Sequence, residues 1–248
     1  MNVYLHKMEK TVSEAIAYRR STRIYKDVPI DTEIVKQCLV NASLAPTSSN
    51  LQLWEFYHIT NKEKIGTLAE MCFNQGAAKT AQQLVVIVAR KDLWRKRAND
   101  VLSARNNTSS ENSTEKELKY NKRNTKYFKT VIPILYSDFL GVFGWIKYFI
   151  FQIIGLFRPV YRQTRNSDLR VVTHKSAGLA AQNFMISMAA IGYDTCPMEG
   201  SDTLRVKKIL GLPRGAEINM IIGCGIREEK GIHGPRIRVP FEDVYFEV

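Results

Sequence analysis

The sequence lacks any arrangement of cysteines that would predict a disulfide framework or a bound metal ion. Its four cysteines are far apart, and none forms a C-x-x-C motif or stands beside a histidine at ligand spacing. They are Cys38, Cys72, Cys196 and Cys224. The opening MNVYLHKMEK also lacks the uninterrupted apolar run of a signal peptide. We therefore expect reduced thiols, no metal site and a cytoplasmic protein.

The common catalytic fingerprints are missing as well. The sequence contains no Walker P-loop, no H-E-x-x-H and no G-x-S-x-G. Gly223-Cys224-Gly225 is followed by Ile-Arg-Glu, so the glycine pattern of a dinucleotide-binding Rossmann turn fails. The four histidines are scattered without partners. These absences argue against a hydrolase, a metalloenzyme and a Rossmann dehydrogenase.

Positive charge is plentiful but concentrated in one segment. The net charge is +12, and residues 95–130 hold ten Lys or Arg against four acids, which is half of the excess. Few aromatic residues are interleaved with this basic run, so a nucleic-acid partner is not expected. Since the remainder of the chain is only mildly basic, charge alone does not define the function.

Capping residues and the spacing of apolar residues predict several helices. Thr11 and Glu14 form a capping box, and Asp31 precedes apolar residues at helical spacing. An Ala- and Met-rich segment predicts a long helix over residues 174–191, and Ser201 or Asp202 is expected to cap another helix. The length of 248 residues suits one domain.

Three strands and one connection complete this pattern. Residues 54–59 alternate like a strand, while 84–88 and 218–224 are apolar runs typical of buried strands. Residues 99–126 are poor in apolar side chains and predict an exposed connection. Residues 235–248 are expected to form a tail. The overall class is α+β.

Four short motifs could carry chemistry, and the first two also have an ordinary structural explanation. Residues 19–23 (RRSTR) offer three guanidiniums and two hydroxyls to a phosphate, or form a solvated basic turn. Residues 45–54 (APTSSNLQLW) offer amides and hydroxyls to a heteroaromatic ring edge, or form a polar turn. Residues 196–200 (CPMEG) could hold a backbone N–H toward a ligand. Arg236 and Arg238, two apart on an extended segment, would face the same side.

Taken together, these motifs resemble those of the FMN-dependent nitroreductase family. Its R-R-S-x-[RK], A-P-[ST]-S-x-N-x-Q-x-W, P-[ILM]-E-G and P-[KR]-x-R motifs all occur here in family order. The resemblance covers residues 11–90 and 171–248. It implies a nitroreductase-like fold with a central mixed antiparallel sheet flanked by helices, and an intertwined homodimer with FMN sites at the interface.

The resemblance also implies a set of cofactor-binding residues. The ribityl phosphate would lie among Arg19, Ser21, Arg236 and Arg238, with Arg20 beside them. Arg23 would lie near the N1/O2 edge of the flavin, and Gln75, or Asn74, near its pyrimidine edge. Pro46, Ser48, Asn50 and Gln52 would come partly from the partner subunit. Pro197, Met198, Glu199 and Gly200 would line the ring, with a backbone N–H near N5.

No side chain is expected to act as an obligatory acid or base, because the flavin supplies the redox chemistry. Arg23 and Glu199 would only lie near the ring. The implied reaction is ping-pong hydride transfer from NAD(P)H to a small electron-poor acceptor such as a nitroaromatic, a quinone or an enone. Two alternatives stay open: a flavin-dependent reductive dehalogenase or dehydrogenase, and a non-catalytic flavin-binding redox sensor.

Residues 95–170 depart from the compact family pattern and form an insert within a single domain spanning 1–248. Residues 131–157 are dense in apolar side chains, but Asp138 and Lys147 interrupt them, so a transmembrane helix is not expected. Two interpretations stay open. The segment is either a lid or helix pair packed over the dimer and the flavin pocket, or a peripheral membrane contact, since basic residues flank it on both sides.

Overall fold

The computed structural model describes residues 9–108, 114–139 and 141–248. Three expectations fall partly outside these residues. The absence of a signal peptide concerns mainly residues 1–8. The predicted connection includes residues 109–113, and the apolar segment 131–157 includes Leu140.

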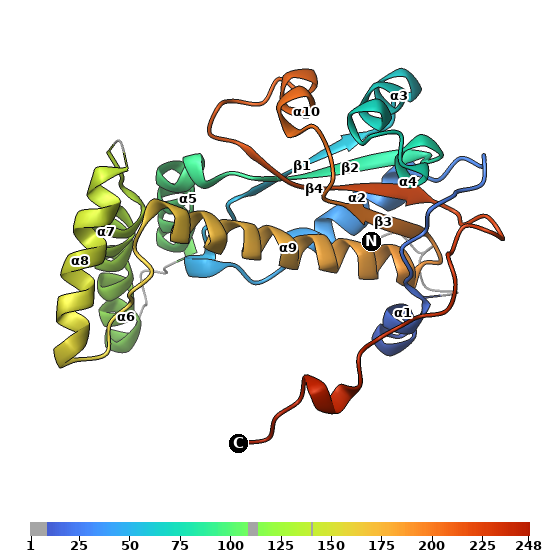
Figure 1. Ribbon diagram of the computed structural model, residues 1–248. Helices are drawn as coiled ribbons and strands as arrows, with labels where there is room; N and C mark the ends of the chain where they lie inside the picture. The colour runs from blue at the N-terminus through green and yellow to red at the C-terminus, as the bar shows by residue number, and fades with distance from the viewer. Residues whose placement is uncertain (1–8, 109–113, 140) are drawn as a thin grey trace.

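A four-stranded sheet forms the centre of the fold, in the order β1-β2-β4-β3 (Figure 1). The strands are β1 (Trp54–Ile59), β2 (Gln83–Ala89), β3 (Asp194–Met198) and β4 (Glu217–Gly225). All three pairings are antiparallel. The sequence resemblance predicted a mixed sheet, and its parallel component in the described residues is a single bridge between Ser21 and Thr195. β2 is buried along its whole length, as its continuous apolar run predicts.

Helices cover both faces of the sheet because alternate residues of β2 supply both cores. Val85 and Ile87 pack against α2 (Thr32–Ser43) and α9 (Asn166–Ala190). Leu84, Val86 and Val88 pack in a second core on the other face. The remaining helices of this body are α1 (Val12–Tyr18), which packs on α9, and α3 (Lys62–Met71), α4 (Gly76–Lys79) and α10 (Thr203–Ile209), which cover the second face (Figure 1).

The predicted helix caps are present. Thr11 and Glu14 satisfy each other's backbone donors, and Asp31 accepts from Glu33 N at 2.8 Å and from Ile34 N at 3.3 Å. Asp202, rather than Ser201, caps α10. The long helix starts at Asn166, earlier than expected, because Asp168 accepts from the Arg165 backbone N at 3.1 Å and closes its first turn.

Residues 99–126 are mostly exposed where they are described, as expected, but the prediction that they form a connection rather than helices is wrong. The described residues belong to two helices, α5 (Trp94–Thr108) and α6 (Glu115–Lys126). Low apolar content misled the prediction, since α5 buries only Ala98 and Val101 of its described residues, α6 has no buried residue, and Lys, Arg and Glu are good helix formers. A capping box between Thr114 and Glu117 starts α6. The π-helical turn Tyr127–Val131, α7 (Ile132–Tyr136) and α8 (Val142–Phe157) follow.

The insert packs onto the main body through a third apolar core. Leu51 and Leu53, from the loop before β1, are buried against Val101, Phe128 and Ile132 of the insert. In the described part of the chain, no helix is long and apolar enough to cross a membrane.

The chain ends in an extended arm that leaves the body beyond residue 235, as the expected tail (Figure 1). Short 3₁₀ turns occur at Ser48–Asn50, Lys91–Leu93 and, in this arm, Phe241–Asp243. The arm carries exposed apolar side chains at Ile237, Val239, Phe241, Val244 and Phe246. The arm therefore exposes a run of apolar side chains to solvent.

Candidate functional site

The RRSTR motif leaves α1 as an extended segment along β3. Ser21 forms the parallel bridge with Thr195, and Thr22 N donates to Thr195 O at 3.2 Å. β3 itself was missed from the sequence because Pro197 lies within it. Proline is tolerated there because β3 pairs only with β4 among the strands and forms an edge of the four-stranded sheet. The bridge brings residues 19–23 beside residues 196–200.

Two glycines bring the C-terminal arginines to the same place. Arg23 N donates to Gly231 O at 2.6 Å, and a Cβ at Gly231 would lie only 2.3 Å from Ile24 O, so only glycine fits. Gly234 has φ +64° and turns the chain. Arg20 Nη2 donates to Gly234 O at 2.9 Å, which holds the turn against the motif.

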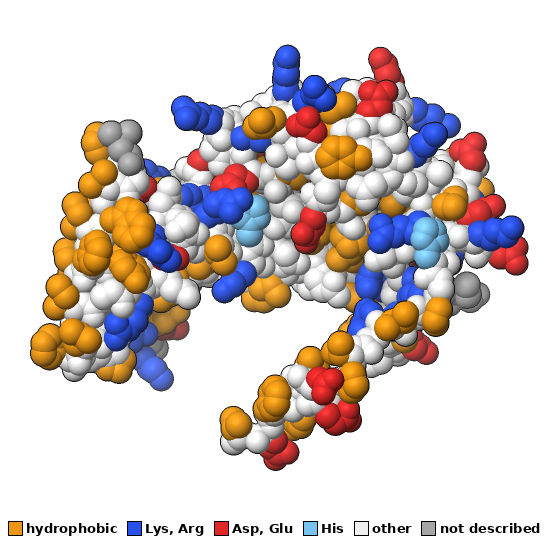
Figure 2. Space-filling model, in the orientation of Figure 1, with side chains coloured by type: hydrophobic (Ala, Val, Ile, Leu, Met, Phe, Trp, Pro, Cys, Tyr) orange, Lys and Arg blue, Asp and Glu red, His pale blue; other side chains and the backbone are white. Residues whose placement is uncertain are grey.

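A pocket of about 240 Å³ lies between these two segments. Its lining residues are Arg19, Arg20, Ser21, Arg23, Ile232, His233, Pro235, Arg236, Ile237 and Arg238. Figure 2 shows basic side chains gathered where the C-terminal arm leaves the body. Five guanidiniums from the two ends of the sequence therefore surround one cavity.

The positive charge of this pocket is uncompensated. Among the described residues, no carboxylate forms an ion pair with any of the five arginines. Burial lowers the pKa of Arg19, and the neighbouring charges of Arg236 and Arg238 lower it further. Such a cluster is suited to a polyanion, because an anion relieves this repulsion through charge-assisted hydrogen bonds.

Gln75 joins the same side of the molecule. Its Nε2 donates to Gly200 O at 2.9 Å. A Cβ at the adjacent Gly76 would lie 2.7 Å from Arg23 O, so the two backbones are in close contact. Glu199, Gly200 and Asn74 are exposed and Pro197 is half-buried, whereas the Met198 side chain points into the core. Only backbone groups of Met198 are therefore available to a ligand.

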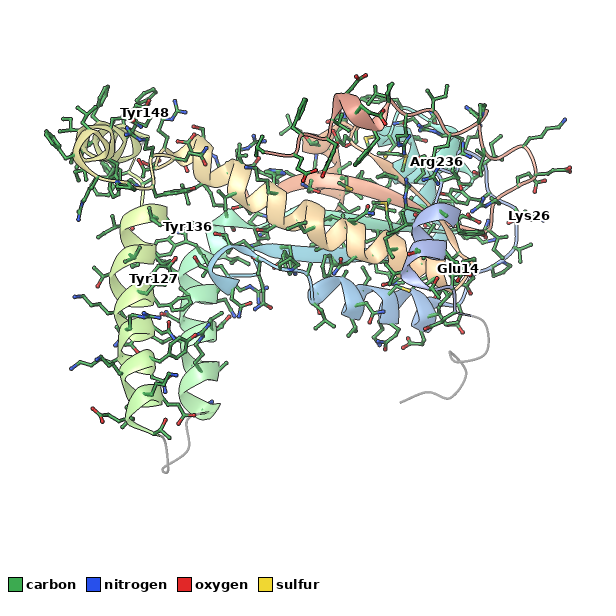
Figure 3. All side chains as sticks on the ribbon, turned by 90° about the horizontal axis from the view of Figure 1, so that it is seen from below. Glu14, Lys26, Tyr127, Tyr136, Tyr148 and Arg236 are labelled. Atoms are coloured by element: carbon green, nitrogen blue, oxygen red, sulfur yellow. The ribbon has the colours of Figure 1, made fainter. Side chains whose placement is uncertain are left out.

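Pro46, Ser48, Asn50 and Gln52 lie elsewhere, at the opposite end of the sheet. Trp54, just after them, pairs with Ala89, which pairs with Glu217. Thr195, beside the arginines, pairs with Cys224. Seven residues of β4 separate the two ends, about 24 Å at strand spacing. Figure 3 agrees: Arg236 lies at the end of the body opposite Tyr127 and Tyr136 of the insert. One chain does not bring the two groups together.

The loop at that far end is shaped by left-handed residues and held by the insert. Ser49, Asn50 and Gln52 have φ values near +50°, and Gln52 N donates to Thr47 Oγ1 at 3.3 Å. The Ser49 hydroxyl lies 2.7 Å from the Tyr127 hydroxyl. Asn50 and Gln52 line a second pocket of about 420 Å³, shared with α5. Arg97 of α5 also lines it, and its buried Nε has no hydrogen-bond partner in the described residues.

The sequence reasoning missed an ion pair that supports the arginine pocket. Asp194 has a side chain only 1% exposed, and it pairs with Arg227, whose Nε donates to Oδ1 at 2.6 Å. Arg227 also donates to Tyr18 O at 3.2 Å and lies over the Tyr18 ring. This cluster holds the end of α1, from which the RRSTR motif departs. The available signal in the sequence was an aspartate, Asp194, at the start of a mostly buried segment, because a buried acid requires a positively charged partner.

No group of three or more metal-ligating side chains occurs in the residues that the structure describes, and the four cysteines are buried and free.

Comparison with known proteins places this geometry in context. The nitroreductase family model matches residues 16–226. Protein DrgA of Synechocystis is 25% identical over 217 residues, which cover 87% of this chain and 84% of that protein. A crystal structure from Exiguobacterium sibiricum, solved in complex with FMN, is 22% identical with a TM-score of 0.69, covering 98% and 99% of the two chains. The NADPH:FMN oxidoreductase of Vibrio harveyi, in complex with NAD+, is 18% identical with a TM-score of 0.60, covering 95% and 76%.

Proposed function

The chain belongs to the nitroreductase family, and on that premise we propose that it is an FMN-dependent oxidoreductase that transfers hydride from NAD(P)H to an electron-poor small molecule. One observation carries the proposal above the others. Arginines from both ends of the chain surround a pocket of about 240 Å³ that contains no compensating carboxylate among the described residues. A phosphate dianion has the charge and the acceptor geometry that such a pocket requires.

The arginine pocket would hold the ribityl phosphate of FMN. Arg19, Ser21, Arg236 and Arg238 would bind it, with Arg20 holding the Gly234 turn in place. The close packing of Arg23, Gln75 and Gly200 would continue the site toward the flavin ring. Bound FMN would supply hydride acceptance and donation, while the chain binds it, orients it and places the positive charge of Arg23 near its N1/O2 edge.

A backbone N–H of residues 197–200 would lie near the flavin N5, because this turn adjoins Gln75. Pro197 has no N–H, so the donor would be at Met198, Glu199 or Gly200. The one histidine that lines the arginine pocket, His233, lies on the phosphate side, away from the expected position of the ring. We therefore assign no obligatory side-chain acid or base.

The active form would be a homodimer. The residues Pro46, Ser48, Asn50 and Gln52 lie a sheet's length away from the arginines of their own chain, so a second copy would supply them to the same cofactor. The exposed apolar side chains of the C-terminal arm would cover part of that partner. We further place the protein in the cytoplasm, where its four free thiols would stay reduced.

The two substrates would use the site in turn, in a ping-pong order. NAD(P)H would bind first and its oxidised form would leave before a nitroaromatic, quinone or enone enters. The absence of a Rossmann glycine motif supports this order, because the sequence offers no separate nicotinamide-binding domain.

The test is reconstitution of the purified chain with FMN, followed by the visible spectrum and by NADH and NADPH oxidation with menadione or nitrofurazone. Flavin absorbance, turnover, parallel double-reciprocal plots and a dimeric mass by light scattering are expected. If the protein binds flavin but shows no turnover, the result would favour the alternative function, a flavin-binding redox sensor. Failure to bind FMN would refute the proposed cofactor and with it the activity.

A further inference from the structure

Helix α8 presents its apolar side chains to solvent, the reverse of an ordinary surface helix. Phe149 is 61% exposed and Ile153 is 60% exposed. The outward face, called here the α8 face, consists of Val142, Trp145, Ile146, Phe149, Ile150, Ile153, Leu156 and Phe157. These positions recur at spacings of three and four, so they form one continuous stripe along the helix. Figure 2 shows hydrophobic side chains covering the outer side of the insert.

The inward side of α8 is fixed by a glycine and a buried lysine. Gly144 lies against the start of α9, where a Cβ would lie 3.1 Å from Asn166 N. Lys147 is 5% exposed, and its Nζ donates to Leu135 O and Ser137 O at 2.7 Å each. Because a buried ammonium is costly without partners, these two bonds set the rotation of the helix. The apolar face is therefore held outward by specific contacts.

The surroundings of the α8 face are basic and aromatic. Residues 139–167 contain no aspartate or glutamate. The Arg165 guanidinium lies 5.0 Å from the Tyr148 ring centroid and 5.4 Å from that of Trp145. Arg162 donates to Gln152 Oε1 at 2.7 Å and closes the C-terminal end of α8, next to the exposed Arg158. An apolar stripe with arginines and aromatic rings beside it matches an element that lies at a lipid–water boundary.

The dimensions exclude a spanning helix and favour a helix lying in the surface. α8 has 16 residues, about 24 Å at helical rise, which is shorter than a hydrocarbon core of about 30 Å. A second copy is a poorer occupant. A symmetric contact between two α8 faces would place Arg158 and Arg162 of both copies along one contact, and neither arginine forms an ion pair with a carboxylate of the described residues.

We propose that the α8 face seats this protein on an anionic lipid surface. The apolar stripe enters the boundary region and Arg158 and Arg162 meet the lipid headgroups, while the charge of Arg165 is already paired with Asp168 at 3.0 Å. Seating the insert in this way would bring the enzyme to acceptors dissolved in the membrane, such as quinones. That consequence rests on the proposed redox function, whereas lipid binding does not.

Sedimentation of the full-length, FMN-treated protein with vesicles tests the inference. We expect binding to equimolar phosphatidylcholine and phosphatidylserine at low salt, and weaker binding to phosphatidylcholine alone. The emission of Trp145, the most exposed of the three tryptophans, should shift to the blue. No sedimentation with the anionic vesicles would overturn the proposal, whether or not the protein binds FMN.

Matched variants identify the surface. The double variant Phe149→Ser/Ile153→Ser should lower the partition coefficient between water and anionic vesicles about tenfold or more. The reason is that two large apolar side chains, whose transfer from water into the membrane favours binding, are then missing. Leu204→Ser, at a 78% exposed position on α10, should bind like the wild type. Arg158→Gln should weaken binding to anionic vesicles only. Equal binding of the double variant and the wild type would refute the role of α8.

Light scattering in the absence of lipid tests whether a second copy of the chain, rather than a membrane, covers the α8 face. Wild type and the double variant should have the same mass. If the double variant shows a smaller assembly, the α8 face belongs to a protein interface and the membrane assignment is wrong.

Discussion

Arg236 Nη2 donates to the backbone carbonyl oxygen of Arg19 at 2.7 Å, across 217 residues of sequence. A second bond, to Ala17 O at 2.9 Å, holds the same guanidinium at the end of α1. The C-terminal segment is thereby tied to the first helix before any ligand binds. This arrangement also places like charges together: burial lowers the pKa of Arg19, and the charges of Arg236 and Arg238 lower it further.

Arg238→Gln should separate cofactor binding from stability. We expect the Kd for FMN to rise about tenfold or more, the worth of a charge-assisted hydrogen bond. The apoprotein should not melt earlier, because Arg238 destabilises the charged Arg19 in the folded state. Flavin fluorescence titration and thermal melts with and without FMN measure both, with Arg214→Gln in the α10–β4 connection as control. A lower apoprotein Tm with unchanged FMN affinity would contradict this assignment.

Asp194→Ala should strongly destabilise the protein. The carboxylate is buried, and its loss leaves Arg227 without its partner, at a cost of about 3–5 kcal/mol. Urea unfolding measures the change. Arg170→Gln, which breaks a more exposed pair with Glu217, is the comparison and should cost about 1 kcal/mol or less. If Asp194→Ala does not fold, Asp194→Asn gives the same ranking with a smaller loss. Equal effects at the two sites would refute a buried structural pair.

The four thiols should be inert in the native state. Burial raises the pKa of Cys72 to about 11 and that of Cys38 to about 12, and also raises the pKa of Cys196 and Cys224. At neutral to mildly alkaline pH only about one Cys72 thiol in a thousand, and fewer of the Cys38 thiols, are then ionised. Ellman's reagent should detect no fast-reacting thiol in the folded protein and four equivalents in guanidinium chloride. One rapid equivalent without denaturant would show that a cysteine is accessible.

Glu217 should make stability depend on pH in the acid range. Burial alone would raise its pKa, but hydrogen bonds from Arg170 and His174 lower it below the ordinary 4.5. A carboxyl with a lowered folded-state pKa contributes stability that is present above its unfolded-state pKa and is lost as pH falls through the folded-state pKa. Urea unfolding of wild type and Glu217→Gln from about pH 7 to about pH 3 should show a difference that shrinks with acid. It should stay below about 1 kcal/mol, since both partners are partly exposed.

Local signals predicted the elements whose stability is local. The capping box at Thr11 and the cap at Asp31 start helices in the structure, and the apolar run over residues 84–88 lies in the buried strand β2. These predictions succeeded because a cap satisfies donors within its own first turn, and a fully apolar run has no other place than the core.

The failures involve contacts between distant segments. Residues 99–126 looked like a connection because few of them are apolar, but Leu51 and Leu53 supply the partners on which the insert packs. β3 was missed because Pro197 disfavours strands, and its edge position in the four-stranded sheet removes that penalty. Nothing in the sequence indicated that Asp194 would pair with Arg227, which lies 33 residues further along the chain.

The sequence by itself determined which groups this protein has available: five arginines in two short motifs, an amide-bearing loop and an apolar segment with basic flanks. Its own local chemistry also determined most helix starts and the central strand. Only the tertiary structure decided that Arg19 and Arg236 share a pocket, that Asn50 lies a sheet's length away, and that α8 turns its apolar face outward. Proximity and direction depend on strand pairing and on single contacts such as those of Gly231 and Lys147, which no sequence spacing encodes.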